Sequence, residues 1–119
     1  MYRSFAHQYT HKERHDECLR IKTNYPDKIP IICERVFDHS VNKSRVLDKK
    51  KYLVPSMMMV SEFIIVIKKR LKMPPNDALF FMINGIILSG NTRIDHVYER
   101  HKSNDGFLYI TYTEENVFG

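Results

Sequence analysis

The chain has 119 residues, the size of one domain, and a hydrophobic content of 43%. A domain of this size buries about two thirds of the surface of its unfolded chain, so it can hold a core without disulfides, and wholesale disorder is excluded. Its net charge of +5 and pI of about 9.2 favour anionic partners. Acidic peptides, acidic lipid surfaces and nucleic acid all remain open on this basis.

The two cysteines, Cys18 and Cys33, are too few for a disulfide framework, which indicates a reducing compartment. The first residues lack the apolar segment of a signal peptide. The longest apolar run, residues 63–67, is too short to span a bilayer. If the protein resides on a membrane, something other than a spanning helix attaches it.

The first predicted elements are helical. Thr10 and Glu13 form a capping box that predicts a helix over residues 11–24. This segment is strongly basic with few apolar residues, so we expect it on the surface of the domain. Residues 3–8 are predicted to form a separate short helical turn.

Two strands follow. Residues 29–37 are rich in β-branched side chains and predict a strand. Pro30 has no amide donor, so it fits near a strand start or at an edge. Residues 38–47 predict a loop, and residues 51–54 a second strand that pairs with the first as a hairpin.

Helical spacing begins next and predicts one buried stripe, with cations near its C-terminal end that suit the helix dipole. The stripe consists of Val60, Phe63, Ile64, Ile67 and Leu71. Residues 73–76 end this helix.

The last elements alternate. Residues 78–83 predict a strand, and Asn84–Gly85 predicts a two-residue hairpin turn into residues 86–88. Thr92 and Asp95 predict the start of a helix, and residues 107–112 predict the last strand. This order is typical of an α+β fold and matches a ubiquitin-like β-grasp with an N-terminal helical addition.

Two groups of residues could form functional sites, but each also has a purely structural explanation. His11, His15 and Cys18 share one face of the first long helix, and with His7 they are candidate zinc ligands. A solvated basic face explains them better, so no metal is expected. Residues 105–112 partly match an RNA-recognition signature, but an acid and a leucine replace two of its positions.

Catalysis is not indicated. A nucleophilic Cys18 or Cys33 needs a base and an orienting group, and Cys33 lies among strand residues that indicate core. With only four glycines there is no phosphate-binding loop. Residues 57–59, all methionine, are either an adaptable contact surface or core filler. We therefore expect no catalytic residue and no cofactor.

Gly119 is the sharpest chemical feature. A glycine carboxylate has no side chain to clash in a narrow enzyme channel, so it can be adenylated, passed on as a thioester and transferred to an amine. The preceding Phe118 is a candidate anchor for processing enzymes. The plain alternative is a chain that happens to end there.

Five separated motifs, in order, resemble the ubiquitin-like autophagy modifiers, the family of the GABA-receptor-associated protein and of microtubule light chain three. The resemblance covers residues 5–119. Its markers are residues 25–32 with Glu34, residues 48–55 (DKKKYLVP), residues 78–81, residues 105–109 and residues 118–119.

The resemblance implies a β-grasp with two N-terminal helices. Residues 1–24 would form the helical extension, residues 25–113 the core and residues 114–119 a flexible conjugation tail. It implies activation of Gly119 with ATP, conjugation to phosphatidylethanolamine on the autophagosomal membrane, and reversal by a cysteine protease. The protein would be cytoplasmic before conjugation, with no nucleic acid as partner.

The resemblance also implies binding of short W/F/Y-x-x-L/I/V motifs of autophagy receptors as a strand added beside the second strand. Pocket one, for the aromatic residue, would be lined by Glu17, Ile21, Pro30, Ile32, Lys51, Leu53 and Phe107. Pocket two, for the aliphatic residue, would be lined by Tyr52, Val54, Pro55, Met58, Phe63 and Val66. Acidic residues beside the motif would meet Lys28, Lys49, Lys51 and Arg70. Strand alternation agrees, since Lys51 and Leu53 share one face.

This sequence departs from the family pattern in places. Met59 stands where threonine usually caps the central helix, and Ser56 is the alternative cap. Met58 replaces a leucine in pocket two, and His11 replaces an aromatic residue. Extra residues lie within 38–47. The alternative function is an unconjugated β-grasp adaptor for trafficking or cytoskeletal partners.

Overall fold

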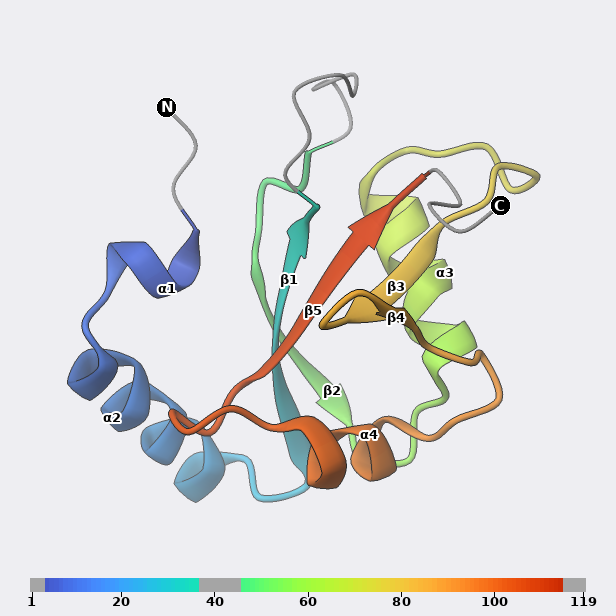
Figure 1. Cartoon of the computed structure of the whole chain (residues 1–119). Helices are drawn as coiled ribbons and strands as arrows, with labels where there is room; N and C mark the ends of the chain where they lie inside the picture. The colour runs from blue at the N-terminus through green and yellow to red at the C-terminus, as the bar shows by residue number, and fades with distance from the viewer. Residues whose placement is uncertain (1–3, 37–45, 115–119) are drawn as a thin grey trace.

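The computed structural model describes residues 4–36 and 46–114. This part of the chain contains four helices and five strands (Figure 1). In chain order they are α1 (Phe5–Gln8), α2 (His11–Asn24), β1 (Lys28–Arg35), β2 (Lys51–Pro55), α3 (Val60–Arg70), β3 (Phe80–Ile83), β4 (Ile86–Ile87), α4 (Ile94–His101) and β5 (Leu108–Thr113).

The five strands form one mixed sheet in the order β2-β1-β5-β3-β4. The β1 and β5 strands are parallel neighbours at the centre, and Ile31 lies opposite Leu108. The β1–β2 pair is antiparallel, as predicted for a hairpin, and so is the β3–β4 pair. Pro30 precedes the first residue of β1 that pairs with β5, so its missing amide hydrogen breaks no ladder bond there.

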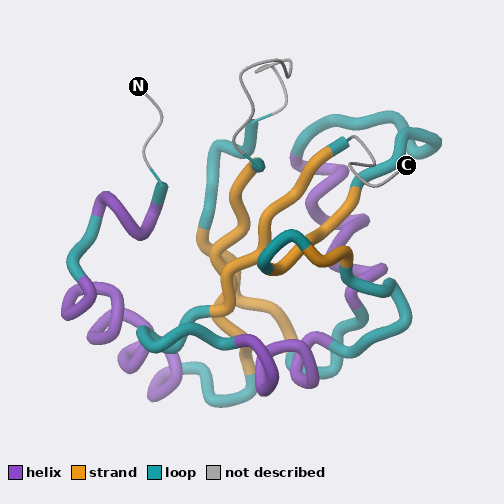
Figure 2. Tube along the Cα trace, viewed as in Figure 1, coloured by secondary structure: helices purple, strands orange, loops and turns teal. Residues whose placement is uncertain are grey.

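Helices cover both faces of the sheet (Figure 2). One face carries the main core, where side chains of β1 and β5 pack against α3 and α4. The opposite face carries a smaller cluster that seats α1 and α2 on the sheet; it contains Phe5, Cys18, Ile21, Ile32 and Phe107. The two faces alternate along β1, because Ile31 belongs to the main core and Ile32 to the smaller cluster.

The predicted capping box of α2 is present. The Thr10 hydroxyl accepts from the Glu13 amide at 3.1 Å, and the Glu13 carboxylate accepts from the Thr10 amide at 2.8 Å. The bounds of this helix are those predicted. Of the predicted stripe, Val60, Phe63, Ile67 and Leu71 are buried, and Ile64 is half-buried.

The predicted start of α4 is wrong, and so is the alternative cap of α3, although α3 begins at Val60 as predicted. Helix α4 is capped by Arg93 rather than by Thr92, because the Met58 and Ser56 carbonyls accept the first amides of the helix. Ser56 does not cap α3. The cap is Met59, whose amide donates to the Glu62 carboxylate at 2.9 Å.

The strands are shorter than predicted at several ends. β1 stops at Arg35, β3 begins at Phe80, β4 stops at Ile87 and β5 begins at Leu108. The predicted loop at 38–47 lies almost entirely outside the described residues. Asn84 and Gly85 both have positive φ, 51° and 79°, as a tight hairpin turn requires.

Helix α3 ends in an unusual way. The Met73 amide donates to the Lys68 carbonyl at 3.0 Å, and Lys72 between them has a φ of 57°. This is the left-handed helix end that usually carries glycine. A lysine there is held in a backbone conformation that its side chain disfavours.

Candidate functional site

Strand β2 lies at one edge of the sheet, and its free edge is the first candidate for binding. The Cys33 amide donates to the Lys50 carbonyl at 2.8 Å. Hydrogen-bonded pairs alternate along an antiparallel ladder, so the backbone N–H and C=O groups of Tyr52 and Val54 also point towards β1. Those of Lys51 and Leu53 therefore point away from the sheet. An extended peptide can therefore pair with Lys51 and Leu53.

Side chains of β2 alternate between core and surface. Tyr52 and Val54 are buried in the main core, whereas Leu53 is 36% exposed and Pro55 is exposed. Lys51 lies on the same side as Leu53, as the alternation predicts. An apolar surface residue beside open backbone groups is what a strand-adding ligand needs.

The side chains predicted for pocket one come together between α2 and the sheet. Ile21, Ile32 and Phe107 form part of the small cluster and are at most 4% exposed. Pro30 is buried as well and lies opposite Leu53 in the ladder. These residues form an apolar floor beneath the outer face of the sheet.

Glu17 and Lys51 form the rim of pocket one. The Lys51 Nζ donates to Glu17 Oε1 at 3.1 Å, and Arg20 donates to the same oxygen. The hydrogen bond from Arg20, with further help from Lys51, holds the pKa of Glu17 below its usual range. This bridge joins α2 to β2 across the outer face, and a bound peptide would have to share or displace it.

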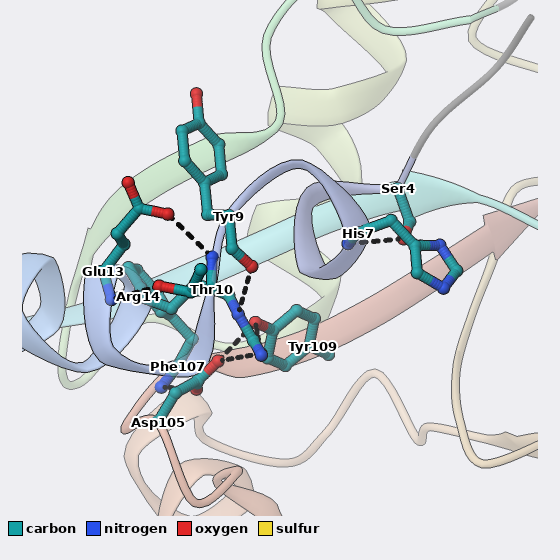
Figure 3. A network of polar contacts seen from close by, with 9 residues as sticks. All are labelled: Ser4, His7, Tyr9, Thr10, Glu13, Arg14, Asp105, Phe107 and Tyr109. Atoms are coloured by element: carbon teal, nitrogen blue, oxygen red, sulfur yellow. Dashed lines mark hydrogen bonds and ion pairs between the residues drawn. The ribbon is translucent and has the colours of Figure 1, made fainter.

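The rim depends on how α2 is fixed to the sheet, and Figure 3 shows the contact that fixes it. The Arg14 guanidinium donates to the fully buried carboxylate of Asp105 at 2.8 Å. That carboxylate also accepts from the Tyr109 hydroxyl at 2.5 Å and the Phe107 amide at 2.9 Å. Burial, reinforced by the bond to Asp105, raises the pKa of Tyr109.

The side chains predicted for pocket two divide by depth. Tyr52, Val54 and Phe63 are core residues, with the Tyr52 and Phe63 rings 5.7 Å apart. Burial raises the pKa of Tyr52 to about 12. The accessible part consists of Pro55, the half-buried Met58 and Val66, which is 37% exposed. These three are the side chains that a ligand can reach without opening the core.

The predicted cations flank both ends of β2. Lys28 lies opposite Pro55 at one end. At the other end Lys49 and Arg70 lie over the Tyr52 ring, at 5.1 and 5.9 Å from its centroid. Arg70 also donates to Asp48 at 3.2 Å. A bound peptide with acidic flanks would therefore meet positive charge on either side.

Two residues of this site were missed from sequence. Arg20 competes with Lys51 for Glu17, and Asp48 competes with any ligand for Arg70. The Glu17–Arg20 pair could have been predicted, because oppositely charged residues three positions apart on a helix lie side by side. No local pattern links Asp48 to Arg70.

Phe118 and Gly119, which carry the tail prediction, lie outside the described residues. The last described residue, Glu114, forms an ion pair with Arg35 at the end of β1. The tail therefore leaves the sheet beside the C-terminal ends of β1 and β5.

The structure gives little support to cysteine catalysis, metal binding or RNA binding. Cys18 and Cys33 are buried, and burial raises the pKa of both thiols, that of Cys18 to about 11. In residues 4–36 and 46–114 no three metal-ligating side chains gather in one place. The RNA-like aromatics are not free to stack, because Phe107 is fully buried and Tyr109 is bonded to Asp105.

Two further observations concern the rest of the surface. A cavity of about 490 Å³ lies away from β2, between Arg14, Asn84, Lys102 and Tyr109. Among the described residues no helix has the length and apolar character needed to cross a membrane.

Comparison with known proteins decides the family. Residues 13–119 match the family described as autophagy protein Atg8, ubiquitin-like. The chain belongs to the Atg8 family. This confirms the predicted resemblance, and with it a role as an autophagy-related, ubiquitin-like modifier.

Individual relatives agree over nearly the whole chain. The autophagy-related protein 8 of Schizosaccharomyces pombe is 45% identical over 115 residues, 97% of this chain and 93% of that protein. The Mycosarcoma maydis protein is 40% identical over 98% of this chain and 96% of its own. The crystal structure of Trypanosoma brucei ATG8 superimposes with a TM-score of 0.85 at 31% identity, covering 95% of each chain. The predicted ubiquitin-like α+β fold is thereby confirmed.

Proposed function

We propose that this Atg8-family protein is joined through Gly119 to phosphatidylethanolamine and, on the autophagosomal membrane, recruits proteins that carry W/F/Y-x-x-L/I/V motifs. The observation that carries the recruiting half is the open edge of β2, where Lys51 and Leu53 present backbone groups beside an exposed leucine. Activating and conjugating enzymes and a deconjugating cysteine protease are the expected enzymatic partners. Family membership supports the conjugation half.

The motif would bind as a sixth strand beside β2. Its aromatic side chain would enter between Glu17 and Lys51, over the floor made by Ile21, Ile32 and Phe107. Its aliphatic side chain, three residues on, would lie against Pro55, Met58 and Val66. The spacing fits, because successive side chains of a strand alternate between its two faces, so side chains three positions apart point to opposite faces. Pocket one lies on the α2 side of the sheet and pocket two on the α3 side.

Lipid conjugation is tested with purified activating and conjugating enzymes, ATP and phosphatidylethanolamine liposomes. The unaltered protein is compared with Gly119→Ala, and the enzymes are first shown to work on a known modifier. We expect a lipidated species only from the unaltered protein. No product from the folded protein would rule out conjugation and leave the unconjugated adaptor.

The peptide groove is tested separately with Leu53→Ala and the matched control Leu19→Ala, since Leu19 is 58% exposed on α2 away from β2. We expect Leu53→Ala to weaken motif-peptide binding about tenfold, a typical effect for a contact residue worth somewhat over 1 kcal/mol. Conjugation and the free energy of unfolding should stay unchanged. Equal binding by both variants would place the groove elsewhere.

A further inference from the structure

The C-terminal end of α3 carries a group of cations that the peptide groove does not account for. We call it the α3 end cluster: Lys68, Lys69, Arg70 and Lys72. Lys69, Arg70 and Lys72 are exposed. Within the described residues only Arg70 of this cluster has an ion-pair partner, Asp48, and Lys68 donates to the Pro75 carbonyl.

This charge is less neutralised than the charge on α2. Lys12 pairs with Asp16, Arg14 with Asp105, and Arg20 with Glu17. In the part of the chain that the structure describes, Lys69 and Lys72 have no carboxylate partner. They are therefore free to meet an outside anion without first breaking an internal ion pair.

The cluster lies at the end of the sheet from which the tail departs (Figure 1). Side-chain contacts link the two along a continuous path. Arg70 pairs with Asp48, the neighbouring Leu47 amide donates to the Tyr112 hydroxyl at 3.0 Å, and Tyr112 lies near the end of β5. Helix α4 lies at the opposite end of the molecule in Figures 1 and 2.

Lys72 adds an independent observation. It occupies the left-handed position that ends α3, with a φ of 57°, where glycine is the favoured residue. Backbone conformations that a side chain disfavours concentrate at functional sites. A lysine therefore occupies a position where the backbone conformation favours glycine, and its charge adds to the cluster.

We propose that the α3 end cluster is a contact site for an anionic lipid surface, engaged through Lys69 and Lys72 when the chain is held at a membrane by its tail. The proposal rests on the proposed attachment at Gly119. The five residues from 115 to 119 reach at most about 17 Å, which keeps the tail end of the domain near the bilayer. Attraction between exposed lysines and anionic lipid extends about 8–10 Å at physiological salt, so this end of the domain is within reach.

The contact would give the attached protein a fixed orientation. With the tail end facing the lipid, α4 would point away from the membrane, and β2, which runs along the side of the sheet, would stay accessible to receptors (Figure 2). Arg70 is shared between the cluster and the predicted groove, so the test below leaves it unaltered.

The test attaches the protein without the conjugation enzymes. The full-length chain with Gly119→Cys is coupled to maleimide lipid in nanodiscs made with or without phosphatidylserine, and a gadolinium lipid reports which backbone amides approach the surface. Coupling is selective because Cys18 and Cys33 are buried and their thiol pKa values are raised. Failure of enzymatic conjugation therefore leaves this measurement readable.

In nanodiscs that contain phosphatidylserine, we expect the gadolinium lipid to attenuate the amide signals of residues 69–72. High salt should restore these signals, because it screens the attraction between the lysines and the lipid. Lys69→Gln with Lys72→Gln should lower the ratio of lipid-facing to free orientations about 25-fold, fivefold for each lysine. The matched control, Arg100→Gln with Lys102→Gln, removes the same charge at the end of α4 and should change nothing. Attenuation independent of phosphatidylserine, or equal losses in both variants, would overturn the proposal.

Discussion

Replacing Asp105 by asparagine should show how far the helical layer depends on one buried charge. The change keeps the shape of the side chain but removes its charge, and it places an amide donor against the donors of Arg14 and Tyr109 (Figure 3). The bond from the Phe107 amide can survive, because asparagine retains an acceptor oxygen.

Removing one partner of a buried ion pair costs about 3–5 kcal/mol. The Arg14 side chain is 16% exposed, so water can solvate part of the charge that is left behind. We therefore expect the free energy of unfolding to fall by about 2–3 kcal/mol, a large part of the 5–15 kcal/mol typical of a domain. Urea denaturation measures this loss.

The loss should also be local. Amide hydrogen exchange in α2 should accelerate more than exchange in β1 and β5, because the network fastens the helix and not the sheet. The control, Asp16→Asn, makes the same chemical change at a carboxylate that is 56% exposed, and it should have little effect. A loss for Asp105→Asn no larger than for the control, or equal acceleration throughout the sheet, would refute this reasoning.

Three further predictions concern single positions. Lys72→Gly should raise the free energy of unfolding by about 1 kcal/mol by relieving the φ of 57°, and a decrease in urea denaturation would contradict this. Gly106→Ala should lower it by about 2–4 kcal/mol, because the φ is 95° and the new Cβ would lie 2.7 Å from the Cys18 sulfur; a loss below 1 kcal/mol would show that the loop adapts. Burial raises the pKa of Cys18 from 9.0 to about 11, so its thiolate fraction at neutral pH is about 100-fold smaller than usual. A thiol reagent should therefore label Cys18 and Cys33 only after urea unfolds the chain, and the part of stability that depends on Cys18 should fall as pH rises from 9 towards 11, where the unfolded thiol ionises first.

Local signals predicted the local structure. The capping box of Thr10 and Glu13 placed α2 correctly, and Asn84–Gly85 placed the β3–β4 turn, because each depends on neighbours in sequence. The start of α4 failed for the opposite reason. Its first amides bond to carbonyls that precede α3, and a segment that distant leaves no mark on the sequence near Thr92.

In the site, too, features that depend on neighbours in sequence were predictable and contacts between distant segments were not. Alternation predicted that Lys51 and Leu53 share one face of the strand, since that depends only on the strand itself. The bond between Arg14 and Asp105 joins residues 91 apart in sequence, and the contact of Gly106 with Cys18 is similarly remote. Neither could be predicted from spacing, although both position the helix that carries Glu17.

The central place of β5 has a consequence for the newly made chain. The β1–β2 hairpin can form as soon as both strands have left the ribosome, but the other edge of β1 stays unpaired until residues 108–113 have been synthesised. During that interval the apolar residues 31–33 border an open strand edge, which can pair with another unfinished chain. Because such long-range pairing is slow, synthesis that stalls before Leu108 leaves a sheet without its middle strand and a chain prone to aggregate.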